Sequence, residues 1–173
     1  RTCWRRCMPI RPHPLSLRAI AAIVAAPALL LVAAVFGVPD RILYNPSHSI
    51  PPGFYVRVEA PITPGAIVTV RAVDVAGAYA IERDFADPGD RFIKRVAATR
   101  GQVVCATGNE ISIDAVIIAR RAERDSAGRL LPTWSGCRTL PGDEVFLLGD
   151  TPDSFDGRYW GPISLELIEG VWR

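Results

Sequence analysis

Residues Arg91–Ala97 read RFIKRVA, a short stretch in which apolar and basic side chains are interleaved. Successive side chains of a β-strand point to opposite faces, so Phe92, Lys94 and Val96 would share one face. The other face would carry two arginines and an isoleucine. The pattern therefore predicts a strand that holds a lysine among apolar neighbours, where burial lowers the pKa of an amine.

Similar short stretches rich in Val, Ile and aromatic residues recur along the chain, and Gly and Pro turn signals separate them. The predicted strands are Phe54–Val58, Ile67–Arg71, Phe92–Ala97, Gln102–Ala106, Ile111–Ile113, Val116–Ile118 and Val145–Leu148. One short helix is predicted over Val75–Phe85, and Ala122–Trp134 is predicted to be a loop or hairpin. Short strands between turns indicate a mainly β domain, either a sandwich or a barrel.

The first part of the chain differs in composition from the rest. Residues 1–18 contain five arginines and no acid, and residues 19–38 form an uncharged, mostly apolar run interrupted by Pro27. A helix of that length spans roughly 30 Å, the thickness of a bilayer core. Basic residues before the run orient its N-terminus toward the cytoplasm. We therefore expect a basic cytoplasmic tail (1–18), a transmembrane anchor (19–38) and an exported domain (39–173); a cleaved secretory signal is the alternative.

The overall charge and the cysteines add further limits. A net charge of +2 is too small to indicate nucleic-acid binding, and the basic tail before an apolar run favours lipid instead. Cys105 and Cys137 form an even pair in the part expected to be exported, which suggests a disulfide, with two buried free thiols as the alternative. The spacing of Cys3 and Cys7 leaves their role unassigned.

Lysine is rare in this chain: of 20 Lys and Arg residues only Lys94 is lysine. Arginine stays protonated and cannot act as a general base, whereas a buried lysine can. An arginine-biased genome that left one lysine by chance is the alternative explanation. His48 cannot support a Ser–His site with its neighbour Ser49, because adjacent residues of an extended segment point in opposite directions.

The segment Asn45–Gly53 reads NPSHSIPPG and follows the expected anchor closely. Prolines on both sides of Ser49 restrict the backbone and would hold its hydroxyl in place. Ser47 would lie on the same side and could join the Ser49 amide in an oxyanion hole. A flexible Pro/Ser linker is the alternative. A third segment, Leu148–Pro162, combines charges, glycines and aromatics and is typical of a structured functional loop or of a surface turn with ion pairs.

Together these three segments resemble the boxes of the S26 signal-peptidase family, most closely its TraF branch of conjugative-transfer peptidases. Ser49-Ile50-Pro51-Pro52 resembles the nucleophile box, and Phe92–Val96 resembles the lysine box. Gly149-Asp150 and Asp153–Pro162 resemble the last box. The resemblance covers nearly the whole chain and implies a signal-peptidase-like β domain behind a single transmembrane helix.

The resemblance also implies roles for individual residues. Ser49 would be the nucleophile, Lys94 the general base and Ser47 an oxyanion donor. Ser154 would hydrogen-bond the lysine ammonium, while Asp150, Asp156 and Arg158 would form a supporting ion network; these four supporting residues all belong to the last box. The paired cysteines Cys105 and Cys137 are also TraF-like. The resemblance implies neither a cofactor nor a metal, and no nucleic-acid partner.

Three positions depart from the family pattern. Gly157 stands where a serine is usual, Thr151-Pro152 replaces a longer stretch, and Thr99–Gln102 replaces the usual Leu-Pro-Gly-Asp. They affect supporting positions rather than Ser49 and Lys94.

The resemblance implies a membrane-inserted, pilin-like precursor as substrate, with small residues at the cleaved bond. The lipid bilayer and type IV secretion components would be partners, at the bacterial inner membrane with the catalytic domain in the periplasm. Hydrolysis and peptide cyclisation stay open. A general signal peptidase and a non-catalytic scaffold subunit of a secretion apparatus are the alternatives.

Overall fold

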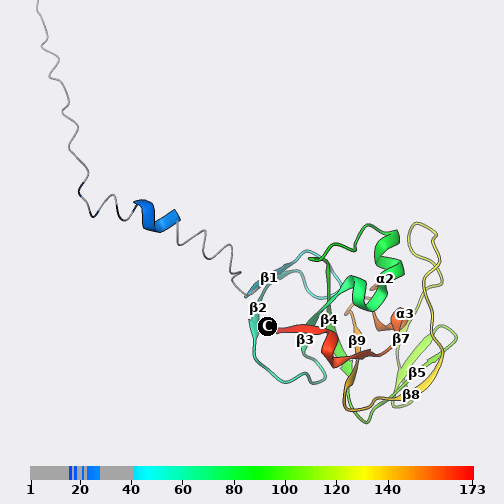
Figure 1. Ribbon diagram of the computed structural model, residues 1–173. Coiled ribbons are helices and arrows are strands. Elements are labelled where there is room, and N and C mark those ends of the chain that lie inside the picture. The colour runs from blue at the N-terminus through cyan, green and yellow to red at the C-terminus, as the bar shows by residue number, and fades with distance from the viewer. Residues whose placement is uncertain (1–15, 17, 19–20, 22, 28–40) are drawn as a thin grey trace, which may run out of the picture. The chain divides into compact units, whose positions relative to one another are not determined.

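The structure is a computed structural model that describes residues 16, 18, 21, 23–27 and 41–173. Residues Asp40–Arg173 form one compact unit built mainly of β-strands (Figure 1). No helix among the described residues is long and apolar enough to span a bilayer. The predicted tail over 1–18 and anchor over 19–38 fall largely outside the described residues.

The larger of two sheets contains seven strands in the order β1-β2-β11-β3-β4-β9-β10. Their bounds are β1 (Ile42–Asn45), β2 (Gly53–Val58), β3 (Ile67–Arg71), β4 (Arg91–Ala98), β9 (Glu144–Leu148), β10 (Ile163–Ser164) and β11 (Ile168–Trp172). The C-terminal strand β11 lies between β2 and β3, antiparallel to both. Residues 168–172 thus pair with strands that lie about a hundred residues earlier in the sequence.

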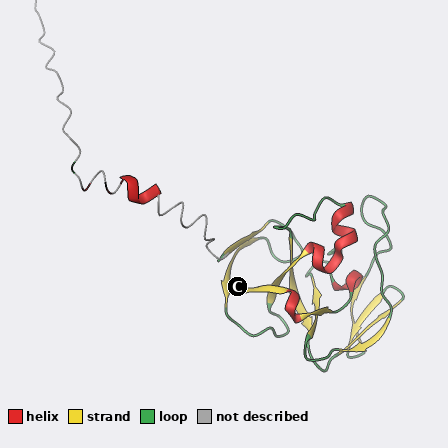
Figure 2. Ribbon diagram, in the orientation of Figure 1, coloured by secondary structure: helices red, strands yellow, loops and turns green. Residues whose placement is uncertain are grey.

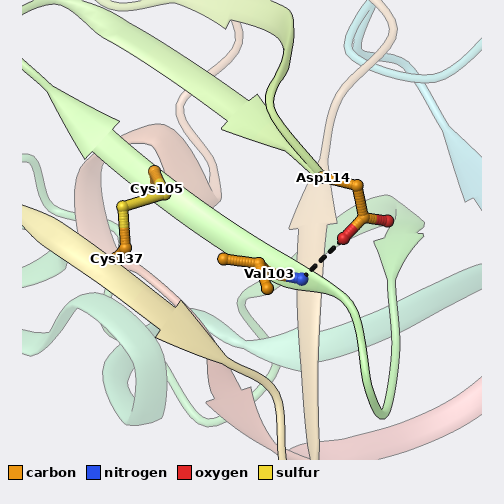
Figure 3. Close-up of a disulfide and its surroundings, with 4 residues drawn as sticks. All are labelled: Val103, Cys105, Asp114 and Cys137. Atoms are coloured by element: carbon orange, nitrogen blue, oxygen red, sulfur yellow. Dashed lines mark hydrogen bonds between the residues drawn. A yellow bond between two sulfur atoms is a disulfide. The ribbon is translucent and has the colours of Figure 1, made fainter.

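The smaller sheet contains four antiparallel strands in the order β7-β6-β5-β8. They are β5 (Val103–Thr107), β6 (Glu110–Ile113), β7 (Val116–Arg120) and β8 (Gly136–Thr139). A disulfide joins Cys105 on β5 to Cys137 on β8, which are direct partners in the strand register (Figure 3). At the start of β5 the Asp114 carboxylate accepts a hydrogen bond of 2.8 Å from the Val103 amide.

Helices are short and few among the described residues (Figure 2). Within residues 41–173 they are α2 (Ala72–Glu82), α3 (Gly157–Trp160) and the 3-10 helix η1 (Leu165–Leu167), and the described residues 18, 21 and 23–27 are helical as well. The helix predicted over Val75–Phe85 is thus present but begins and ends earlier. It is alanine-rich, with Asp74 in its first turn, and it is kinked where Ala76 leaves helical geometry. The loop predicted over Ala122–Trp134 contains only an isolated bridge between Arg124 and Leu130.

Every predicted strand is present, with small shifts at its ends, which confirms a mainly β fold. Strands β1, β8, β10 and β11 were not predicted. Two of the three buried clusters meet at β9, where Val145 and Leu147 pack in one cluster and Phe146 in the other. The period-2 alternation of a strand thus connects the core of the large sheet with that of the small sheet.

Candidate functional site

The loop between β1 and β2 carries Ser49, and the next residue, Ile50, anchors this loop in the core. Ile50 is fully buried and packs with Tyr55, Ile93 and Trp172. Ile93 precedes Lys94 on β4, so a single apolar cluster fixes the residue beside Ser49 against the residue beside Lys94. The Tyr55 hydroxyl also donates a hydrogen bond of 2.6 Å to the Pro51 carbonyl.

Lys94 lies on β4 with its side chain directed at this loop. Its Nζ donates a hydrogen bond of 2.9 Å to Ser49 Oγ, and only 3% of the residue is exposed. The Phe92 ring centroid is 5.6 Å from the same nitrogen, as expected for side chains on one face of a strand. Ser47 Oγ lies 3.1 Å from Ser49 Oγ on another side. The structure therefore brings Ser47, Ser49 and Lys94 together.

Burial lowers the pKa of Lys94 from 10.5 to about 8. The cause is desolvation, which disfavours the charged ammonium, and the Arg158 cation acts in the same direction. The carboxylates of Asp156 and Asp150 oppose this shift without cancelling it. A lysine in this environment can exchange a proton with a hydroxyl near neutral pH, which an exposed lysine cannot do.

The segment after β9 is organised by a buried ion pair. Asp156 is fully buried and its carboxylate lies 3.0 Å from the Arg158 guanidinium. The same carboxylate accepts hydrogen bonds from the backbone amides of Gly149 and Arg158. Arg158 in turn donates to the carbonyls of Gly149, Thr151 and Pro152. Burial raises the pKa of Asp156, against the effect of the neighbouring guanidinium.

Asp150 does not join this ion pair and has a different partner. Its carboxylate forms a bidentate salt bridge with Arg95, in which Nε and Nη2 donate to the two oxygens at 2.8 and 2.7 Å. This salt bridge lowers the pKa of Asp150. The expected three-residue ion network is therefore wrong in this detail. Arg95 reaches Asp150 because β4 pairs with β9 in a register that places Arg95 opposite Leu148. The Asp150 amide also donates a hydrogen bond of 2.6 Å to the Ser49 carbonyl.

Gly149 packs tightly against Ser154 and the Ser49 backbone, and no room is left for a side chain at position 149. A Cβ added at Gly149 would lie 2.0 Å from Ser154 Oγ and 2.9 Å from the Ser49 carbonyl oxygen. Ser154 is buried, and its hydroxyl has no hydrogen-bond partner among the described residues. The expected bond between Ser154 and the Lys94 ammonium is therefore not formed in this structure.

Gly157, one of the departures from the family pattern, has a steric explanation. A Cβ at this position would lie 2.5 Å from the Leu147 carbonyl and 2.7 Å from the Phe146 ring. The phenylalanine ring thus occupies the space that a serine side chain would need, so this fold requires glycine here.

A pocket of about 680 Å³ opens beside Ser49 and Lys94. Its wall is rich in aromatic side chains from β1, α2, the segment after α2, β4 and the segment before α3; these are Tyr44, Tyr79, Phe85, Phe92 and Phe155. Tyr79 and Phe155 stack with their ring centroids 3.4 Å apart. The pocket is large enough for several side chains of an extended peptide. Among the described residues no group of three His, Cys, Asp or Glu side chains is placed to hold a metal ion.

The loop over 121–134 connects the small sheet to the segment that carries Asp156 and Arg158. Arg121 is buried and donates hydrogen bonds to the carbonyls of Trp134, Arg158 and Gly108. The Trp134 indole donates to the Gly157 carbonyl at 2.9 Å. These bonds attach the loop to α3 at the carbonyls of Gly157 and Arg158.

Two residues that contact this site were not predicted from the sequence as site residues. Asn45 is 3% exposed and bonds to several groups of the Ser49 loop, and Arg95 holds Asp150. An asparagine at the start of a proline-rich turn is a signal for side-chain-to-backbone bonding, so Asn45 could have been found. Arg95 could not, because its partner depends on the β4–β9 pairing.

Comparison with known proteins identifies the family of this chain. The family model for signal peptidase, peptidase S26, matches residues 15–173. Two plasmid transfer proteins TraF from Escherichia coli are 38% and 36% identical to this chain over 92 and 85 residues. These matches cover 50% and 47% of this chain, and 52% and 48% of the relatives. The chain therefore spans about half the length of the curated relatives it matches.

Among solved structures, a signal peptidase I from Enterococcus faecalis V583 matches with a TM-score of 0.38 and 22% identity. That match covers 66% of this chain and 97% of the other chain. Since the family model covers nearly all of the sequence, the chain belongs to the signal peptidase S26 family and is TraF-like within it.

Proposed function

We propose that this chain is a serine endopeptidase in which Ser49 is the nucleophile and Lys94 the general base. The observation that carries the proposal is the 2.9 Å bond between Lys94 Nζ and Ser49 Oγ at a lysine that is 3% exposed. A nucleophile next to a base with a depressed pKa is the arrangement that covalent catalysis by serine requires.

In the proposed mechanism neutral Lys94 takes the proton from Ser49, and the alkoxide attacks a peptide carbonyl. The Ser49 amide and the Ser47 hydroxyl would stabilise the oxyanion. Lys94 would then protonate the leaving amine, and water would release the acyl group from Ser49. Because the reactive form of Lys94 is the neutral amine, activity should increase as the pH rises through about 8.

The substrate that we propose is an exported precursor protein. The family and the similarity to plasmid transfer proteins TraF support this class, and they favour a pilin-like precursor of a conjugation apparatus. Transfer of the acyl group to an amine of the substrate itself, in place of water, would give a cyclic product. Type IV secretion components would then be the assembly partners.

We also propose that the enzyme lies at the inner membrane with the domain 39–173 in the periplasm. The apolar run over 19–38 supports the anchor, and an exposed apolar face of the β1–β2 hairpin supports a bilayer next to the domain. Register pairs Ile42 with Val56 and Tyr44 with Phe54, and these four side chains are 53–75% exposed. Tyr44 also lines the pocket that contains Ser49, so the apolar face is continuous with the pocket wall.

The test is cleavage of a co-expressed pilin precursor, measured by intact mass for wild type, Ser49→Ala and Lys94→Arg. The arginine variant keeps the positive charge but has no usable base. Ser126→Ala, a change in an exposed loop, is the matched control and should behave as wild type. Activity that persists in either site variant would contradict the dyad.

The same measurement distinguishes hydrolysis from cyclisation, because only hydrolysis adds the mass of water to the product. A secretory precursor offered in parallel would identify a general signal peptidase if it were cleaved in preference to the pilin. Full binding of the precursor without cleavage by wild type would favour the scaffold function.

A further inference from the structure

Asn45, the last residue of β1, makes five hydrogen bonds to the Ser49 loop. Its Nδ2 donates to the carbonyls of Ser47, Ile50 and Pro51, at 3.0, 2.9 and 3.3 Å. Its Oδ1 accepts from the Ser47 amide at 3.0 Å and from the Ser47 hydroxyl at 2.7 Å. The asparagine itself is 3% exposed and its bond to the Ile50 carbonyl is buried, whereas Ser47 lies at the surface.

The contacts fix the orientation of the Asn45 amide. Three carbonyl oxygens surround Nδ2 and a backbone N–H faces Oδ1, so the opposite orientation would place acceptors against acceptors. Oδ1 has lone pairs only, and the Ser47 hydroxyl must therefore donate its single proton to Asn45. It follows that Ser47 Oγ accepts from Ser49 across the 3.1 Å contact between the two hydroxyls.

The hydrogen bonds consequently run in one direction, from Lys94 to Ser49, from Ser49 to Ser47, and from Ser47 to Asn45. In this state the Ser49 proton points away from Lys94, and every hydroxyl has one donor and one acceptor partner. For Ser49 to react, its proton must turn toward neutral Lys94. For Ser47 to stabilise an oxyanion, its proton must leave Asn45.

We propose that Asn45 is a positioning residue that acts through the Ser47 hydroxyl. Asn45 holds Ser47 Oγ beside the nucleophile and sets the direction of the hydroxyl chain in the free enzyme. This inference rests on the proposed peptidase function. It predicts that the contribution of Ser47 to catalysis depends on an acceptor atom at position 45.

The test is acylation of Ser49 by p-nitrophenyl acetate in the full chain, with Ser49→Ala as the blank. Both the acylation rate constant and the ester concentration for half-maximal rate are measured. Ser47→Ala is introduced into wild type, into Asn45→Ala, and into Asn45→Asp, whose carboxylate keeps an acceptor for the Ser47 hydroxyl. This is a double-mutant cycle, which isolates the coupling between the two residues.

We expect Ser47→Ala to slow acylation by about tenfold or more in wild type and in Asn45→Asp, as for the loss of one oxyanion donor. In Asn45→Ala, where the hydroxyl is no longer held, the same change should slow it by less than about threefold. The half-maximal ester concentration should change by less than about twofold throughout.

The same factor in all three backgrounds would overturn the inference, because it would mean that Asn45 only folds the loop. Thermal unfolding of each variant separates folding from positioning, and if Asn45→Ala does not fold, loss of the Ser47 effect in Asn45→Asp would equally overturn it. Wild type that reacts no faster than Ser49→Ala would contradict the proposed function itself, which is a different result.

Discussion

At the scale of single residues, Lys94 shows that the site and the stability of the fold make opposite demands. Keeping an amine 3% exposed lowers its pKa to about 8, so at neutral pH the folded protein must hold a poorly solvated ammonium. Below pH 8 this penalty is fully present. Between pH 8 and 10.5 the unfolded chain binds more protons than the folded one, so the stability of the fold increases with pH in that interval.

Replacement of Lys94 by methionine should therefore stabilise the protein while abolishing the proposed activity. Methionine has similar length and no charge, so the free energy of unfolding at pH 7 should increase by about 2–3 kcal/mol, since a pKa shift of this size is worth about 3 kcal/mol. The gain should shrink as the pH rises toward 10. Urea unfolding of both proteins at several pH values measures it, and a Lys94→Met variant less stable than wild type at pH 7 would contradict the buried ammonium.

Gly149 should tolerate no side chain, because of its contacts with Ser154 and the Ser49 carbonyl. Gly149→Ala should lower the free energy of unfolding by about 1–3 kcal/mol through overpacking and should slow acylation of Ser49 about 100-fold by displacing the nucleophile loop. Gly89→Ala, at a glycine with open space around it and no positive φ, is the control. Equal rates in the two variants would show that the contact does not matter.

The resemblance to the S26 boxes predicted that Ser47, Ser49 and Lys94 would lie together, and they do. The lone lysine and the proline-bounded serine by themselves left a chance lysine and a plain linker open. The sequence was not sufficient for the second layer of contacts. Asp150 pairs with Arg95, and the Ser154 hydroxyl is unpaired among the described residues. Neither could be predicted, because both depend on how the segment after β9 packs against β4. Such contacts arise from strand pairing rather than from local pattern.

At the scale of elements, β4 carries Lys94, and β9 contributes side chains to the cores of both sheets. The strands with strong alternation of apolar side chains could be predicted, whereas β8 reads GCRT, is exposed throughout and has no apolar pattern. Strand β11 pairs with β2 and β3, which are about a hundred residues away in the sequence, so its place in the sheet could not be predicted from neighbouring residues. The helix α2 begins earlier than predicted, at Ala72 directly after β3, and Asp74 in its first turn suits a helix N-terminus.

The disulfide between β5 and β8 should stabilise the small sheet without affecting the site. Closure of the chain between Cys105 and Cys137, a separation of 32 residues, is worth about 3–4 kcal/mol in the chain-entropy treatment. The paired change Cys105→Ser with Cys137→Ser should lower the free energy of unfolding by about that amount, while acylation of Ser49 at 25 °C stays within about threefold of wild type. A large loss of acylation in a folded variant would show that the small sheet supports the dyad directly.

At the scale of the whole molecule, the apolar face of the β1–β2 hairpin and the expected anchor are adjacent in sequence. The face consists of Ile42, Tyr44, Phe54 and Val56, all of them exposed. Exposed aromatic and apolar side chains suit the interface of a bilayer. A bilayer at this face would present the pocket to substrates that are themselves held in the membrane.

A photoactivatable phospholipid in vesicles that carry the full chain tests this arrangement. We expect lipid adducts in the peptides that contain Ile42 and Phe54. Ile81 on α2 is the matched control, because its side chain is 68% exposed, close to the 67% of Ile42. Adducts at Ile81 as frequent as at Ile42 would mean that the hairpin face does not contact lipid.

The pKa of Lys94 tests the central claim most directly. Because the sequence contains a single lysine, protein labelled with ¹³C,¹⁵N-lysine gives one side-chain signal, and its titration can be followed by NMR without assignment. The Lys94→Arg variant supplies the blank. A midpoint near pH 8 is the result that the account predicts. A midpoint near 10.4, the value of an exposed lysine, would contradict the role of Lys94 as the base that activates Ser49.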